Sequence, residues 1–331
     1  MPKITYLLGA GASANALPLI KKAKQPAAGF SVFPPNKPGL PEELVQFVQK
    51  YKNSALSKTT LVIALDEITR KCMEFETPDL LAKFLLETGD NKNYMLLKRL
   101  LSNYFSEQQS GVGPGRKQAF DFRALTFLTT ISANSKLPEN VKILSWNYDR
   151  QLEIAAEKLK PVNAQSRSKI KNFNPWPNYR DGVEGEHFRG IPFLLHLNGI
   201  AGYKYTAAAG AEEDASIFNF DDNMDPMISF AWEDESNDSK NTFNSKRIQH
   251  LQSIAANTEI LVVVGYSFPF FNRKIDDEIF KSARSSLSKI YFQDPNLDGN
   301  QLINQFDLSP KLAQNLKHIR EVDNYYVPFE L

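Results

Sequence analysis

Short apolar segments recur along the chain, and each one ends at a turn of small or polar residues. Five of them have the length of strands, at residues 3–8, 141–146, 192–197, 259–264 and 289–293. Near-continuous apolar strands are typical of a sheet that is covered on both faces, and such sheets are parallel, with helices between the strands. The pattern therefore predicts an α/β fold built on a Rossmann-like parallel sheet.

Between the first two of these strands, the apolar residues change to helical spacing. Residues 41–50 open with proline and two acidic side chains, and residues 77–86 open with a capping threonine followed by proline. Residues 93–104 and 119–135 continue the helical pattern. We therefore predict a helical insertion over residues 40–138.

Residues 160–240 are rich in Pro, Asn, Asp and Gly, which predicts loops and a smaller irregular subdomain. Residues 227–232 are the candidate in it for an antiparallel strand. We interpret the acidic residues in 212–225 as a solvated loop rather than a metal site. Residues 111–117 have the glycines of a phosphate loop but lack its Lys-Ser/Thr ending, so we interpret them as a flexible link between helices.

Composition excludes some classes of protein. The 331 residues are 42% hydrophobic and 23% charged, as in ordinary soluble proteins, and 39 basic side chains balance 38 acidic ones. Proteins that bind nucleic acid through unspecific contacts usually have a basic excess. We therefore expect no direct sequence-specific binding of nucleic acid.

The chain also lacks the usual signs of disulfides, metals and membranes. Cys72 is the single cysteine, so neither an internal disulfide nor a zinc site of thiolates can form, and the four histidines lack metal-ligand spacing. The longest apolar run, Ile260–Val264, is far shorter than the roughly 20 residues that span a bilayer. With no charged start and cleavage site before the first strand, we expect a cytoplasmic protein without a metal site.

The first strand leads into a turn of small residues, Gly9-Ala10-Gly11-Ala12-Ser13. Glycines let the backbone approach a phosphate closely, and the start of the following helix favours negative charge. The third glycine of the dinucleotide fingerprint is absent. The turn therefore indicates either a nucleotide-binding loop or tight packing of strand and helix.

Two further strand ends carry candidate catalytic residues. Asn147 and Asp149 follow the second strand; the Asn147 amide can donate and accept at once, as orienting a ribose hydroxyl or a water requires. Asp149 either supports it or caps the helix that starts near Arg150. His196 and Asn198 end another strand, where alternation predicts that they share a face, although a lone histidine among apolar residues is more often a core residue.

Gly265 and Ser267 follow the most apolar strand, and residues of this kind allow a ligand to approach the backbone. Asp294 ends the next strand, where an acid either accepts from ribose hydroxyls or forms an Asp-Pro-Asn turn. Because the carboxyl ends of parallel strands meet at one edge of a sheet, we expect all of these candidates to gather there.

The order of these motifs resembles the sirtuin-like domains of prokaryotic anti-phage defence proteins, from residue 4 to about 295. Four motifs carry the resemblance: residues 9–13 with Leu17 and Pro18 behind them, 147–149, 196–199 and 265–269. The resemblance implies that residues 1–331 form a single sirtuin-like domain that binds NAD between the sheet edge and the smaller subdomain.

The resemblance also implies a reaction, the hydrolysis of NAD to nicotinamide and ADP-ribose by an NADase effector that depletes NAD. Under it, the pyrophosphate is held by Gly9, Ala10, Gly11 and Ser13. Asn147 orients the nicotinamide ribose and the attacking water, with Asp149 in support. Gly265 and Ser267 line the adenosine side, and Asp294 accepts from the adenosine ribose.

The chain departs from the family in two ways. Deacylating sirtuins hold zinc with four cysteines and have Phe and Arg after their first proline; here Cys72 stands alone and Pro18 leads into Leu19, so protein deacylation is not expected. The family histidine stands directly before a glycine, where this chain has Asn198.

Three explanations of this second departure are open. His196 replaces the family histidine from the same strand face, or Asn198 orients the ribose without a general base. In the third explanation, the site binds nucleotide without cleaving it, as a catalytically weak or inactive sensor or scaffold subunit of a defence complex.

Sirtuin-like defence proteins commonly self-assemble and are often gated by another protein, such as a ring-shaped ATPase or a phage-sensing subunit. The resemblance therefore implies a homo-oligomer with a separate trigger. Four leucines of the helical insertion are candidates either for an oligomer surface or for core packing: Leu96, Leu97, Leu100 and Leu101.

Overall fold

The computed structural model describes residues 1–19, 38–52, 59–75, 77–111, 117–159, 170–177, 190–205, 211–213, 225–233 and 238–331. Most of the predicted link at 111–117 and most of the acidic segment at 212–225 lie outside these residues.

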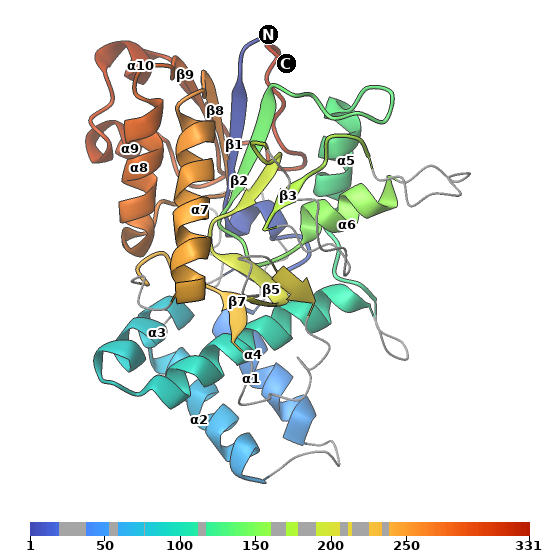
Figure 1. Ribbon diagram of the computed structural model, residues 1–331, viewed down its shortest axis with the longest axis vertical. Coiled ribbons are helices and arrows are strands. Elements are labelled where there is room, and N and C mark those ends of the chain that lie inside the picture. The colour runs from blue at the N-terminus through green and yellow to red at the C-terminus, as the bar shows by residue number, and fades with distance from the viewer. Residues whose placement is uncertain are drawn as a thin grey trace.

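The central sheet has seven strands in the order β10-β9-β8-β1-β2-β4-β3 (Figure 1). Every neighbouring pair is parallel. The strands are β1 (Ile4–Leu8), β2 (Val141–Ser145), β3 (Pro175–Trp176), β4 (Leu194–His196), β8 (Ile260–Val264), β9 (Lys289–Gln293) and β10 (Leu316–Ile319). The predicted α/β fold with a parallel sheet is confirmed; β3 and β10 are strands that the apolar pattern did not single out.

Both faces of this sheet are covered, which explains why its strands are apolar at nearly every position. On one face, Tyr6 and Leu194 pack with α5, α6 and the C-terminal segment around Tyr325. On the other face, Leu7 and Val263 pack beneath the helices that follow β7. These covering helices are α5 (Phe122–Ile131), α6 (Gln151–Lys158), α7 (Asp238–Ala255), α8 (Arg273–Ala283), α9 (Asn300–Gln305) and α10 (Pro310–Gln314).

Four helices between β1 and β2 form a separate core. They are α1 (Leu40–Lys52), α2 (Thr59–Glu74), α3 (Pro78–Glu87) and α4 (Asn91–Ser110). They pack against a small antiparallel sheet of order β6-β5-β7, made of β5 (Gly199–Tyr205), β6 (Ala211–Glu213) and β7 (Pro226–Ile228). The four leucines of α4 named above are all buried in this core. By contrast, α5 lies within the predicted insertion but packs on the parallel sheet.

Local signals explain several helix boundaries. The hydroxyl of Thr77 accepts from Leu80 N at 3.2 Å, and Pro78 is the first residue of α3, as the capping pattern predicts. Helix α8 begins at Arg273, after a short 3₁₀ turn at Phe270–Asn272. Helix α2 was not predicted as a separate element. Among the described helices, none is long and apolar enough to cross a membrane.

The chain reverses its direction across the sheet at β1. Strands β2 and β4 lie on one side of β1, and β8, β9 and β10 lie on the other. The carboxyl ends of all these strands face the small sheet and helices α1–α4, and both termini lie toward the opposite edge (Figure 1). In open α/β sheets, ligands bind outside the carboxyl ends at such a reversal, here between β1 and β8.

Candidate functional site

The glycine turn packs directly against Gly265 at the point where the strand order reverses. The turn is a 3₁₀ helix, Ala10–Ser13, and Gly11 N donates to Gly265 O at 3.0 Å. A Cβ on Gly11 would lie 2.7 Å from Gly265 Cα, and Gly265 itself has φ +56°. Backbone contact between the two turns therefore requires these glycines, as the packing interpretation of the sequence proposed.

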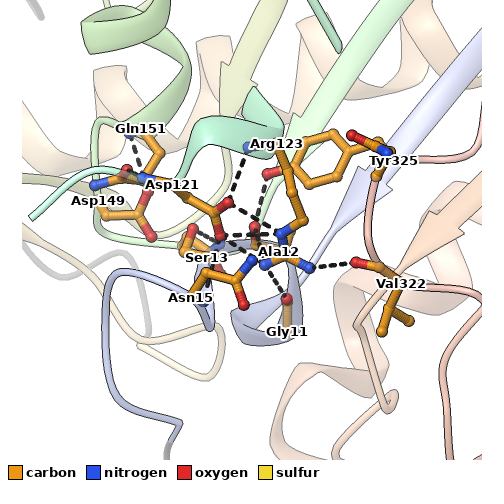
Figure 2. Close-up of polar contacts among 12 residues, drawn as sticks. Gly11, Ala12, Ser13, Asn15, Asp121, Arg123, Asp149, Gln151, Val322 and Tyr325 are labelled. Atoms are coloured by element: carbon orange, nitrogen blue, oxygen red, sulfur yellow. Dashed lines mark hydrogen bonds and ion pairs between the residues drawn. The ribbon is translucent and has the colours of Figure 1, made fainter. Parts of the chain in front are cut away.

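Two side chains from distant parts of the chain hold carbonyl oxygens of this turn (Figure 2). The guanidinium of Arg123 donates to Gly11 O and to Ala12 O, each at 3.1 Å. The hydroxyl of Tyr325 donates to Ala12 O at 2.7 Å. These contacts fix the carbonyl side of the turn against the protein.

Asn147 holds the other end of the turn. Its Nδ2 donates to Gly9 O at 3.0 Å and to Ser13 Oγ at 3.2 Å. In a trans peptide, the N–H of Ala10 points away from the C=O of Gly9. No acceptor among the described residues takes the Ala10 N–H. This amide is therefore available to an anion at the turn.

Asp121 and Arg123 form a buried ion pair beside the turn (Figure 2). Arg123 donates to Asp121 Oδ2 at 2.6 Å, and the exposed fractions of the two side chains are 5% and 0%. Burial alone would lower the pKa of Arg123, but the hydrogen bond and the charge of Asp121 raise it above its usual value. Asp121 Oδ2 also accepts from Asn15 N at 3.3 Å, so the pair holds both the turn and the chain after it.

Asp149 is a buried carboxyl beside the turn. Its Oδ1 accepts from Gln151 N, the first residue of α6, at 3.1 Å, so the predicted capping contact is present. Burial raises the pKa of Asp149 to about 6, a hydrogen bond from Ser13 and the one from Gln151 oppose this, and the charge of Glu153 adds to it. An acid with this pKa exchanges a proton near neutral pH, as a general base or acid must.

His196 is paired with a residue that the sequence did not indicate. Its Nε2 lies 2.8 Å from Glu153 Oε1, and its Nδ1 lies 3.4 Å from Asn147 O. Both ring nitrogens thus face acceptor oxygens of the protein. In this arrangement His196 is well placed to hold β4, α6 and the Asn147 backbone together.

A small polar cavity lies where these residues meet. Its volume is about 10 Å³, close to the smallest space that holds one water molecule. Its polar lining includes Ser13, Asn147, Asp149, Glu153, His196 and Tyr325. The structure thus brings three predicted catalytic residues, Asn147, Asp149 and His196, to one cavity beside the predicted phosphate turn.

Asn198 lies outside this cavity lining. Strand β4 ends at His196, so the alternation that predicts a shared face does not continue to Asn198. Its Nδ2 donates to Trp146 O at 3.3 Å, and its buried Oδ1 has no hydrogen-bond partner in the described part of the chain.

The predicted adenosine-side residues are spread along the carboxyl edge. Ser267 is exposed two residues after Gly265. Asp294 Oδ1 accepts from Asn296 N and Leu297 N, both at 2.8 Å, so the predicted Asp-Pro-Asn turn is present. One oxygen of Asp294 is therefore used by its own turn.

Sequence reasoning missed several residues of the site, namely Asp121, Arg123, Gln151, Glu153 and Tyr325. Only Glu153 left a usable signal, because it is an acid on the mostly buried helix α6, four residues after Asp149. The described residues contain no group of three or more His, Cys, Asp or Glu side chains placed to hold a metal ion.

Comparison of the chain with protein-family models and with curated proteins found no match in either case.

Proposed function

We propose that this protein is a sirtuin-like NAD hydrolase that releases nicotinamide and ADP-ribose. The observation that carries the proposal is the joining of Asn147, Asp149 and Ser13 in one polar cavity, directly beside a glycine turn at the reversal of a parallel sheet. This edge is where α/β sheets bind dinucleotides, and the motif order that suggests NAD falls along it.

The reaction breaks the bond between nicotinamide and C1′ of the ribose and forms a bond from C1′ to a water oxygen. Nicotinamide leaves as a neutral molecule with the electron pair of the broken bond, and the water proton passes to a base. Asp149 is that base in our proposal, because its pKa of about 6 leaves it largely ionised at neutral pH. A positioned base contributes about 10²- to 10⁴-fold to the rate.

The remaining residues have positioning roles in this proposal. Asn147 Nδ2 is committed to Gly9 O and Ser13 Oγ, which leaves Oδ1 to orient the water or the ribose hydroxyls. The Ala10 amide, which has no acceptor among the described residues, takes the pyrophosphate, while Gly265, Ser267 and Asp294 lie toward adenosine. His196 fixes the Asn147 backbone through Nδ1 and is not the proton acceptor.

A second candidate function is binding of NAD or ADP-ribose without cleavage. Two observations favour it: both ring nitrogens of His196 face protein oxygens, and the cavity has room for about one water. In that case the protein is a sensor or scaffold subunit of a defence complex. The two candidates share the binding residues and differ in whether nicotinamide is released.

The biological role in the proposal is that of a cytoplasmic anti-phage effector that depletes NAD. Such an enzyme must be silent until triggered, so we propose a homo-oligomer gated by a partner ATPase or phage-sensing protein. The assay below therefore includes an extract that can supply the trigger.

The test is nicotinamide release from excess NAD, followed by chromatography, for the purified protein alone and in lysate of phage-infected cells. We expect release by the wild type, its loss in Asn147→Ala, and a drop in kcat of about 10²- to 10⁴-fold in Asp149→Asn. Asn257→Ala is the matched control, because Asn257 is exposed at the amino edge of the sheet, where it accepts from Lys3.

The pH profile tests the assignment of the base. Since Asp149 must be ionised to accept a proton, release should rise as pH increases through about 6. Release without this rise contradicts the role of Asp149. Saturable binding of NAD in calorimetry, with no nicotinamide under any condition, contradicts the hydrolase and establishes the binding protein.

A further inference from the structure

The contacts around the glycine turn form one polar network that runs from Tyr325 through Arg123 and Asp121 toward Asp149 (Figure 2). We infer that Arg123 and Tyr325 are positioning residues that fix the glycine turn in the conformation needed to hold the pyrophosphate of a dinucleotide. This inference rests on the proposed function, because it concerns how the same site holds its ligand.

The first step is the geometry of the turn. Its backbone carbonyls and amides point in opposite directions, because each trans peptide fixes C=O and N–H antiparallel. Arg123 and Tyr325 take the carbonyls of Gly11 and Ala12. The Ala12 N–H, opposite the Gly11 carbonyl, donates to Gly9 O at 2.9 Å, so the two side chains fix the 3₁₀ shape of the turn. In this shape the Ala10 N–H has no acceptor in the described part of the chain and is the donor left for an anion.

The second step is the position of the Arg123 charge. Burying an ion pair costs about as much in desolvation as it returns, and well-packed apolar residues often stabilise a protein equally well. The Arg123 side chain donates to Asp121, to Val322 O at 3.0 Å and to the two turn carbonyls. The ion pair therefore holds the Arg123 guanidinium in one orientation, in which it donates to several backbone carbonyls at once. A buried apolar pair cannot provide such donors.

The third step is how Tyr325 reaches the turn. Gln293, at the end of β9, holds the C-terminal segment by donating to Asn324 O at 2.7 Å and accepting from Tyr326 N at 2.9 Å. Tyr325 lies between these two anchors and is buried. The C-terminal segment thus places one hydroxyl on Ala12 O, while the two contacts of Gln293 hold the segment independently of that hydroxyl.

The network also reaches the proposed base. Asp121 N donates to Gln151 Oε1 at 2.7 Å, and Gln151 N donates to Asp149 Oδ1. The side chains that hold the turn are therefore linked by hydrogen bonds to Asp149, the carboxyl that we propose as the proton acceptor. These contacts fix the position of the glycine turn relative to Asp149.

The test compares two tyrosine variants by calorimetry with ADP-ribose. Tyr325→Phe removes only the hydroxyl on Ala12 O, and a lost hydrogen bond of ordinary strength should raise the Kd about 2- to 10-fold. Tyr6→Phe is the matched control, because the Tyr6 hydroxyl donates to Tyr326 O at 3.1 Å, in the same segment but away from the turn. Its Kd should stay at the wild-type value.

Arg123→Lys keeps the charge but loses the planar fork, and it should raise the Kd for ADP-ribose by at least about 10-fold. With nicotinamide riboside, which has no pyrophosphate, wild type and both variants should behave alike. Thermal melting shows whether each variant is folded, and Tyr325→Phe decides the question if Arg123→Lys does not fold.

The outcomes separate the inference from the proposed function. If the wild type binds ADP-ribose and Tyr325→Phe binds equally well, the inference is wrong and the proposed function is untouched. The same holds if Tyr325→Phe and Tyr6→Phe weaken binding equally, since the segment then matters only for stability. If the folded wild type binds neither ADP-ribose nor NAD, the proposed function fails and the inference fails with it.

Discussion

Nε2 of His196 and Oε1 of Glu153 lie 2.8 Å apart, and the exposed fractions of the two side chains are 1% and 4%. This contact joins β4 to α6 across the wall of the polar cavity. Since His196 also faces Asn147 O, the histidine links three elements whose ends carry the site. Its removal must therefore affect stability as well as any reaction.

We expect His196→Ala to lower the free energy of unfolding by about 3–5 kcal/mol, because it removes the imidazole partner of a buried carboxylate. Urea denaturation at pH 7 measures the loss. The double variant His196→Ala/Glu153→Ala should cost less than the sum of the two single variants, because the pair is then removed together. Strict additivity would show that the two side chains do not stabilise each other.

For Asp149 we expect the opposite result: its substitution by asparagine should stabilise the protein. Its folded pKa of about 6 lies above its ordinary value of 3.8, so this carboxyl contributes stability below about pH 4 and loses it as pH rises through 6. Asp149→Asn cannot ionise, and its Oδ1 can still accept from Gln151 N. The variant should be more stable than the wild type by about 2–3 kcal/mol at pH 8.

Urea denaturation at pH 4 and pH 8 tests this expectation. The two proteins should be equally stable at pH 4, where both side chains are neutral. A less stable variant at pH 8 would show that the ionised carboxylate is favoured in the folded protein. Together with the loss of nicotinamide release, a gain in stability is typical of a residue kept for function.

Much of this architecture could be predicted because its causes are local. The strands of the sheet are short apolar runs, since both faces are buried, and Thr77 with Pro78 marks the start of α3. The gathering of residues 147, 196 and 265 at one edge followed from parallel strands alone. The predicted candidates at the glycine turn and at Asn147 lie in contact for the same reason.

The residues that hold the site together could not be predicted, because their role depends on contacts between distant segments. Asp121 and Arg123 have the appearance of an ordinary helix start, and Asp121 does cap α5. Their second function exists only because α5 packs beside the glycine turn more than 100 residues away in sequence. Tyr325 likewise depends on the path of the C-terminal segment, which Gln293 fixes.

Because Gly265 lies in backbone contact with Gly11, we expect Gly265→Ala to be strongly destabilising. Its Cβ would lie 2.5 Å from Gly11 Cα, and φ is +56°. Backbone strain and overlap together should cost about 2–5 kcal/mol. Gly89→Ala isolates the strain, because Gly89 has φ +75° with nothing within 4 Å of the added Cβ, and it should cost about 1–2 kcal/mol. Equal losses in thermal melts would contradict the close contact.

The helical core should depend on one buried ion pair, Lys98 with Glu233. Lys98 Nζ lies 3.0 Å from Glu233 Oε1, and the Lys98 side chain is 0% exposed. Burial would raise the pKa of Glu233, but Lys98 and the Phe230 amide outweigh this and lower it. The pair therefore stabilises the protein above the unfolded pKa of Glu233, and this contribution is lost as pH falls through the folded pKa.

We expect Lys98→Met to cost about 3–5 kcal/mol at pH 7, because it leaves the Glu233 carboxylate buried without its cation. Urea denaturation measures this loss, which should shrink in acid as Glu233 becomes protonated. Lys136→Met is the control: Lys136 and Glu139 are 2.8 Å apart but 51% and 77% exposed, and surface pairs of this kind contribute little to stability. Similar losses of unfolding free energy in the two variants would mean that Glu233 finds another partner or reaches water. In that case the charge of Lys98 does not hold α4 to residues 225–233.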